Sequence, residues 1–234
     1  MDVKFGIIGA MDEEVNGLKS KMELVESVQI AGNEFFKGNL YGREIVVVKC
    51  GIGKVNAAIC TQALIDRFAP QFVINTGVAG SMDARAGIGD IVVSDDLVQH
   101  DFDSTAFGDS EVGEIPRLGM RFFKADKLLI DVALSAPVDT YKLLKGRIAT
   151  GDQFIADAAH KNKIKELFAP LCVEMEGAAI AHACHLNSVP FVVIRAVSDN
   201  ADGSADITFE KFLNLAATNS SLIVEAILRW NTEQ

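Results

Sequence analysis

Four acidic residues stand at or shortly after the ends of apolar runs in this sequence. Glu14 comes soon after the run FGIIG, and Glu174 and Glu176 follow LCV. Asp199 closes the run PFVVIRAVS. An unpaired carboxylate is costly to bury, and two carboxyl groups on either side of one bond can serve as general acid and general base. We therefore take these acids as the first candidates for a site.

Arg195 lies inside the same apolar run as Asp199. A guanidinium cannot lose its proton to escape desolvation, so we expect Glu174 or Glu176 to pair with it. An ion pair that only closes the core would explain the same residues. The acids at 12–14 also have a purely structural explanation, because negative side chains in the first turn of a helix are stabilised by its dipole.

Two glycine-rich turns follow other apolar runs and could let backbone N–H groups approach a ligand. The stretch GIGKVNAA has Asn56 where a Rossmann motif needs its third glycine, and it lacks the GK[ST] of a P-loop. Dinucleotide and triphosphate binding are therefore poorly supported. The second turn, TGVAGS, could serve a ligand or only tight packing.

Metal and acyl-transfer chemistry have little support in the sequence. His182, Cys184 and His185 lie close together, but this spacing on an alanine-rich helix without a second His/Cys cluster favours packing over a zinc site. There is no GxSxG elbow. The four cysteines show no CxxC spacing and lie in apolar segments, so we predict buried, reduced thiols at Cys50, Cys60, Cys172 and Cys184.

Composition limits the class of protein. The 234 residues are 49% hydrophobic and 23% charged, which favours one large core in a single domain over residues 1–234. A net charge of −10 would repel nucleic acid and anionic membrane surfaces. No run of 18 apolar residues is present, so we predict a cytoplasmic protein that binds neither nucleic acid nor membrane.

Apolar β-type runs alternate with amphipathic helical patterns, which predicts an α/β fold. Runs such as FVVI indicate a central sheet covered by helices on both faces. Tyr41-Gly42 predicts a hairpin turn, so the sheet should be mixed. The longest irregular segment, 104–119, is a candidate site or interface loop. We predict strands within 3–9, 44–50, 71–80, 89–95, 146–152, 171–175 and 190–199, and helices over roughly 12–22, 54–68, 126–135, 158–168, 176–187 and 207–230.

Seven motifs in order closely resemble the bacterial methylthioadenosine/S-adenosylhomocysteine nucleosidases of the purine nucleoside phosphorylase superfamily. The resemblance runs over nearly the whole chain and implies a three-layer α/β/α sandwich, phosphorylase/hydrolase-like, with a central mixed β-sheet. It also implies a homodimer that needs no cofactor or metal and acts on adenine nucleosides, including 5′-deoxyadenosine. The motifs are GIIGAMDEEV, CGIGKVNAA, NTGVAGS, GDIVVSD, HDFDSTAFG, VEMEGAAIAHACH and VPFVVIRAVSDNAD.

The same resemblance implies roles for individual residues. Glu14 would activate the attacking water, Asp199 would protonate N7 of adenine, and Glu176 would bind the ribose hydroxyls. Asp199 would need a raised pKa to hold its proton. Other expected substrate contacts are Met11, Ile52, Gly80, Phe154, Ile155, Met175, Arg195, Ser198 and Phe209, together with Phe107 and Pro116 reaching in from the neighbouring subunit.

Three alternatives stay open at this stage. A phosphorylase would use phosphate as nucleophile and would need cations around GIGK and Arg195, whereas Glu14 would repel phosphate. An aminofutalosine hydrolase would keep the chemistry and change the substrate. A non-catalytic nucleoside-binding protein is disfavoured because both Glu14 and Asp199 are present. Val78 stands where the family often has a small hydroxyl residue, which leaves substrate preference in doubt.

Overall fold

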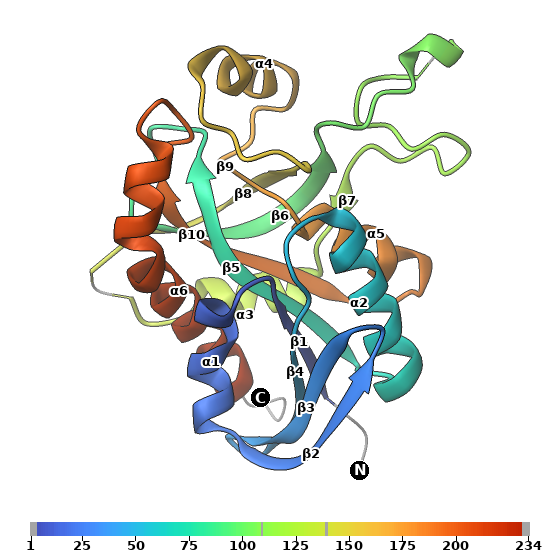
Figure 1. The fold of residues 1–234 in the computed structure, drawn as a ribbon, viewed down its shortest axis with the longest axis vertical. Helices are drawn as coiled ribbons and strands as arrows, with labels where there is room; N and C mark the ends of the chain where they lie inside the picture. The colour runs from blue at the N-terminus through green and yellow to red at the C-terminus, as the bar shows by residue number, and fades with distance from the viewer. Residues whose placement is uncertain (1–3, 109, 139, 231–234) are drawn as a thin grey trace.

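The computed structural model describes residues 4–230, apart from 109 and 139. Within these residues, ten strands join one mixed sheet in the order β10-β6-β8-β9-β5-β1-β4-β3-β2, with β7 paired to β6 (Figure 1). The strands are β1 (Phe5–Gly9), β2 (Glu23–Ile30), β3 (Asn33–Leu40), β4 (Arg43–Lys49), β5 (Phe72–Ser81), β6 (Ile91–Gln99), β7 (Phe123–Lys124), β8 (Leu143–Thr150), β9 (Cys172–Glu174) and β10 (Phe191–Asp199).

Helices cover both faces of this sheet, as the continuous apolar runs predict. Helices α2 and α5 pack on one face, and α1, α3 and α6 pack on the other. Helix α4 lies at one end of the sheet, above β8 and β9 in Figure 1. The helices are α1 (Asp12–Lys21), α2 (Lys54–Phe68), α3 (Lys127–Leu134), α4 (Ala158–Phe168), α5 (Gly177–Leu186) and α6 (Ala205–Arg229), with a 3₁₀ turn η1 (Thr105–Phe107).

The sheet closes on itself at the end that carries α4. Strand β5 pairs with β10 along one edge, while its other edge pairs first with β1 and then with the short β9. Strands β6 and β8 complete the ring between β10 and β9. Between Asn75, paired with β1, and Gly80, paired with β9, the described strands leave this edge of β5 open. The divergence of β1 from β9 makes room for a cavity.

The predicted α/β fold with a mixed central sheet is confirmed, and each predicted helix is present with ends shifted by at most a few residues. The hairpin at Tyr41-Gly42 is confirmed as the antiparallel turn between β3 and β4. All four cysteines are free and buried, as predicted. The predicted strand at 3–9 is observed as Phe5–Gly9, and its first position lies outside the described residues.

Strand β2 was not predicted. Its sequence ELVESVQI has exposed or half-exposed side chains along its whole length, because it forms an edge of the sheet with neither face covered. Apolar alternation is the signal that identifies a half-buried strand, so a strand exposed on both faces is not recognised this way. The strand extends the β3–β4 hairpin away from the cavity.

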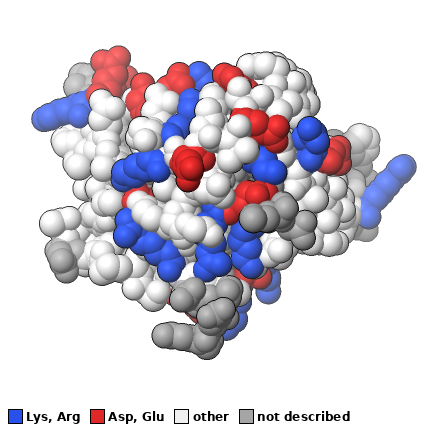
Figure 2. Space-filling model, turned by 90° about the horizontal axis from the view of Figure 1, so that it is seen from below, with Lys and Arg blue, Asp and Glu red and all other residues white. Residues whose placement is uncertain are grey.

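The face seen from below in Figure 2 carries Lys and Arg side chains mixed with Asp and Glu. Several cations of the described residues are paired: Lys21, at the end of α1, and Arg229, at the end of α6, both contact Glu225. Lys37 likewise contacts Glu44. The described helices include none with the length and apolar character needed to cross a membrane.

Candidate active site

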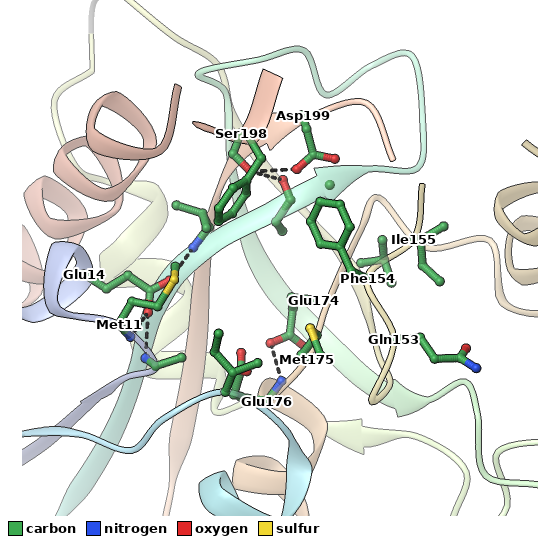
Figure 3. Close-up of a pocket in the computed structure, with 17 residues that line it drawn as sticks. Met11, Glu14, Gln153, Phe154, Ile155, Glu174, Met175, Glu176, Ser198 and Asp199 are labelled. Atoms are coloured by element: carbon green, nitrogen blue, oxygen red, sulfur yellow. Dashed lines mark hydrogen bonds between the residues drawn. The ribbon is translucent and has the colours of Figure 1, made fainter. Parts of the chain in front are cut away.

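The carboxyl ends of β1, β4, β5 and β10 meet at one edge of the sheet because these neighbouring strands run parallel. A cavity of about 370 Å³ lies there. Figure 3 shows Glu14 and Asp199 on opposite sides of it, with Glu176 at its base. Its walls are made by Ala10, Met11, Glu14, Ile52, Val78, Ala79, Gly80, Gln153, Phe154, Ile155, Val173, Glu174, Met175, Glu176, Ser198, Asp199 and Phe209.

Glu14 is held by three backbone N–H groups. Its Oε2 accepts hydrogen bonds from the N–H of Ala10 at 2.6 Å and of Met11 at 3.0 Å. Its Oε1 accepts one from the N–H of Val78 at 3.0 Å, on the open edge of β5. Glu14 is buried, whereas its neighbours Asp12 and Glu13 are exposed. The helix-dipole explanation is therefore sufficient for those two acids but not for Glu14.

Asp199 ends β10 on the opposite wall. Its Oδ2 accepts a hydrogen bond from the hydroxyl of Ser198 at 2.8 Å, and its Oδ1 accepts one from the N–H of Ala201 at 2.8 Å. A side chain at position 80 would overlap the Asp199 carboxyl and Ala201. Gly80 therefore allows the end of β10 to lie close to β5, and the carboxyl group projects into the cavity.

Glu176 stands at the start of α5, and the turn after β4 holds it from the other side. The N–H of Gly53 donates to its Oε1 at 2.8 Å. Gly53 has a φ of 99°, which favours glycine. The same turn is fixed by Asp152, whose carboxylate accepts from the N–H of Lys54 at 2.7 Å, and by Asp101, which pairs with the Lys54 ammonium at 2.6 Å.

Arg195 lies behind the cavity wall and is fully buried. Its Nη2 forms an ion pair with Glu174, donates to Asn75 Oδ1 at 2.7 Å, and lies 3.6 Å from Glu176 Oε2. The predicted pairing of Arg195 with these acids is confirmed. A side chain at Gly77 would overlap both Arg195 and Glu14, so a glycine there allows the two groups to approach each other across β5.

Burial dominates the electrostatics of the site. It raises the pKa of Glu14, although Arg195 and the three backbone donors oppose the rise. It also raises the pKa of Asp199, against the hydrogen bonds from Ala201 and Ser198, as expected for a proton donor. Burial and then the charge of Glu174 raise the pKa of Glu176 to about 8. Burial would lower the pKa of Arg195, but the surrounding carboxylates raise it.

The structure brings most of the predicted site residues to one cavity. Eleven of the fourteen line it: Met11, Glu14, Ile52, Gly80, Phe154, Ile155, Met175, Glu176, Ser198, Asp199 and Phe209. Arg195 does not line it and can act only through the carboxylates that it holds. Phe107 and Pro116 are exposed and lie outside this cavity within one chain, so the neighbouring-subunit role predicted for them stays a prediction.

Sequence reasoning missed four lining residues, Ala10, Ala79, Gln153 and Val173. Each is adjacent in sequence to a predicted site residue or motif, so extending the predicted segments by one position would have found them. It also missed the contacts from the N–H groups of Ala10, Met11 and Val78 to Glu14 and from the N–H of Ala201 to Asp199, because the sequence does not mark backbone donors.

Known proteins match this chain over nearly its whole length. A family described as "Phosphorylase superfamily" matches residues 4–229. A 5′-methylthioadenosine/S-adenosylhomocysteine nucleosidase of Staphylococcus aureus is 46% identical over 95% of this chain and 98% of its own length. The chain belongs to this nucleosidase family of the phosphorylase superfamily.

Solved structures of such nucleosidases share the fold over nearly the whole chain. The Neisseria meningitidis enzyme in complex with methylthio-immucillin-A has a TM-score of 0.93 and 40% identity, covering 97% of this chain and 98% of that one. A futalosine hydrolase of Helicobacter pylori has a TM-score of 0.91 and 36% identity, covering 97% of both chains. The nucleosidase scaffold is therefore shared by enzymes named for different substrates.

The raised pKa of Glu176 predicts a pH-dependent effect of Glu176→Gln on stability. Below the pKa of Glu176 in the unfolded chain, near 4.5, its carboxyl is protonated in both the folded and the unfolded state and does not lower the free energy of unfolding. Between about pH 4.5 and about 8 the unfolded state ionises while the folded state keeps its proton, so the stability of the wild type falls as pH rises, and the loss levels off above about 8. The free energy of unfolding of Glu176→Gln should therefore rise relative to wild type, by up to roughly 1.4 kcal/mol per pH unit in this window.

Urea unfolding of both proteins at a series of pH values measures this difference. Glu13→Gln, at an exposed position of the same charge, is the matched control and should follow the wild type at every pH. A stability difference between Glu176→Gln and wild type that stays constant from pH 5 to pH 8 would contradict the assignment of a raised pKa.

Proposed function

We propose that this protein hydrolyses the N-glycosidic bond of 5′-methylthioadenosine and S-adenosylhomocysteine, and also of 5′-deoxyadenosine, releasing adenine and the 5-substituted ribose. One observation carries the proposal: the carboxyl groups of Glu14 and Asp199 enter the same largely apolar cavity from opposite sides, with Glu176 at its base (Figure 3). The chain matches nucleosidases of this name over nearly all of both sequences. The reaction uses water and requires no cofactor.

The chemistry of the bond requires this arrangement of acids. As the C1′–N9 bond breaks, positive charge develops on the sugar and electrons move onto the purine. Asp199, with its raised pKa, delivers a proton to N7 of the leaving adenine. Glu14 takes a proton from the water whose oxygen bonds to C1′, and Glu176 binds the ribose hydroxyls. Phe154 packs on the base, and Phe209, whose ring centroid lies 5.8 Å from that of Phe154, closes the pocket at the 5′ substituent.

Phosphorolysis fits the cavity less well. A phosphate nucleophile needs cationic side chains or several free N–H groups, but the described residues that line the cavity include no Lys, Arg or His. The Arg195 guanidinium is fully buried behind Glu174. Three backbone N–H groups nearby are already used by the Glu14 carboxylate, which would itself repel phosphate.

The substrate preference depends on the sugar and 5′ side of the cavity. Val78 contributes a buried apolar side chain there, and only its backbone N–H is used by Glu14. The backbone contact from position 78 to Glu14 is therefore kept without a hydroxyl side chain. Aminofutalosine stays the second candidate substrate, because a futalosine hydrolase shares the whole fold. Both substrates would be cleaved by the same pair of acids.

Adenine release without phosphate is the first test. In phosphate-free buffer, the protein should release adenine from 5′-methylthioadenosine and S-adenosylhomocysteine, with a free reducing sugar as the second product. Chromatography of the products measures both. The rate of adenine release from aminofutalosine, measured in parallel, shows how this second candidate substrate compares with the first two. Adenine release that requires phosphate and yields a sugar 1-phosphate would overturn the hydrolase assignment.

Neutral substitutions of the two acids are the second test. Asp199→Asn cannot deliver a proton, and Glu14→Gln cannot take one, so each should lower kcat by about 10²–10⁴-fold. Binding of methylthioadenosine, measured by calorimetry, should persist in Asp199→Asn. The exposed acids Asp206 and Glu13 provide matched controls: Asp206→Asn and Glu13→Gln should keep normal turnover. Near-normal turnover in Asp199→Asn would refute its role as proton donor.

We propose further that the single domain works as a homodimer in the cytoplasm. Three observations support a dimer. The side chain of Phe107 is 91% exposed on an irregular loop, where burial against a partner would be favourable. Ile52, Val55 and Ile59 form an exposed apolar stripe at the start of α2. Because Ile52 also lines the cavity, this stripe reaches the rim of the site, and a partner covering it could place Phe107 there.

Subunit complementation tests this arrangement. The protein should have twice the chain mass of 25.2 kDa in light scattering, and Phe107→Ala should raise KM for methylthioadenosine about tenfold, because a buried phenyl contact is lost. In a mixture of Phe107→Ala and Asp199→Asn subunits, each heterodimer has one site with an intact acid and a donated Phe107. Sites with normal KM should therefore reappear. A monomeric protein, or no recovery on mixing, would contradict the proposal.

A further inference from the structure

The peptide group between Asn200 and Ala201 connects the proton donor to helix α4. Its N–H end, at Ala201, donates to Asp199 Oδ1 at 2.8 Å. Its carbonyl end, at Asn200, accepts a hydrogen bond from the Lys161 ammonium at 2.5 Å. Because a peptide group is planar and rigid, a side chain that holds the carbonyl also sets the direction of the N–H.

We propose that Lys161 is a positioning residue for Asp199 and acts on it through this peptide group. The proposal rests on the proposed function, in which Asp199 protonates the leaving base. Lys161 lies in the first turn of α4 and does not line the cavity. Its effect on the reaction therefore passes through the loop that follows β10.

The backbone at Ala201 has a conformation that the surrounding contacts must stabilise. Ala201 has a φ of 48°, a left-handed conformation that a residue with a Cβ rarely adopts and that persists only where the surroundings fix it. Its methyl group is buried in a cluster with Ile155 and Ile164. Packing thus holds Ala201 from one side, and the Lys161 ammonium holds the preceding carbonyl from α4.

Helix α4 connects two parts of the cavity wall: the segment that carries Phe154 and the region of Asp199. The segment before this helix carries Phe154 and Ile155, which line the cavity. From α4, Lys161 bonds to the loop that follows Asp199, and the rings of Phe154 and Phe209 make a second contact near the cavity. The position of Phe154, on which the substrate packs, and the position of Asp199, which delivers the proton, therefore both depend on α4.

Charge adds a second effect to the geometric one. Burial raises the pKa of Asp199, nearby Asp202 raises it further, and the Lys161 cation lowers it. On α4, the Lys165 cation acts on Lys161 and lowers its pKa. The Cys172 thiol on β9 faces the same region, but burial raises its pKa, so it carries no charge. A cation on a peptide carbonyl also strengthens the N–H at the other end as a donor. Lys161 therefore limits how far the pKa of Asp199 rises.

Substitutions at position 161 test this. Lys161→Met keeps an unbranched side chain and removes the ammonium, whereas Lys161→Arg keeps a cation that can reach a carbonyl. Lys161→Met should lower kcat at neutral pH about tenfold, because a displaced acid transfers its proton poorly, with a smaller change in KM. Lys161→Arg should recover most of the activity. Lys163→Met, on an exposed position of the same helix, should match wild type.

The pKa of Asp199 gives a readout that does not require turnover. Carbon NMR titration of the Asp199 carboxyl, assigned with Asp199→Asn, should show a higher pKa in Lys161→Met than in wild type, and the alkaline limb of kcat should move to higher pH. An unchanged carboxyl pKa, or a loss of kcat shared by Lys163→Met, would overturn the proposal. If the wild type released no adenine, the proposed function would fail, but the titration would still test the link between Lys161 and Asp199.

Discussion

The buried guanidinium of Arg195 is the interaction on which the site depends. It is enclosed in the middle of a strand whose nine residues are all buried, and it is stable there only because Glu174 and Asn75 meet it. Removing one partner of such a pair typically costs about 3–5 kcal/mol. Strand β10 can therefore contain the Arg195 guanidinium only if β9 places the Glu174 carboxylate next to it.

This requirement explains why a strand of only three residues closes the sheet. Strand β9 pairs with both β5 and β8 and ends at Glu174. The Glu174 carboxylate then accepts the N–H groups of Glu176 at 3.0 Å and Gly177 at 2.7 Å, which begin α5. The acid that neutralises Arg195 thus also orients the backbone of the residue proposed to bind ribose. Core stability and site geometry are set by the same side chain.

The sequence predicts the acids and the strand ends well, because apolar runs that finish in a charged residue are a strong signal. It predicts less about what orients those acids. The Val78 N–H is free for Glu14 only because β1 and β9 separate along β5, a consequence of sheet closure that no local pattern encodes. Lys161 was missed for a similar reason: its partner is a backbone carbonyl brought near by tertiary packing. Strand β2 was missed because both its faces are exposed.

In the proposed reaction, the balance of charge around Arg195 would favour the transition state over the bound substrate. Burial is the main cause that raises the pKa of Glu14 and of Glu176. One guanidinium faces the carboxyls of Glu14, Glu174 and Glu176, so the region holds fewer cations than acids. A neutral nucleoside does little to change this. An oxocarbenium-like sugar supplies the missing positive charge at the moment the bond breaks, and interactions that strengthen only then lower the barrier. The Glu176 carboxyl, whose raised pKa reduces the stability of the fold as pH rises, is thus also one that we propose to stabilise the transition state.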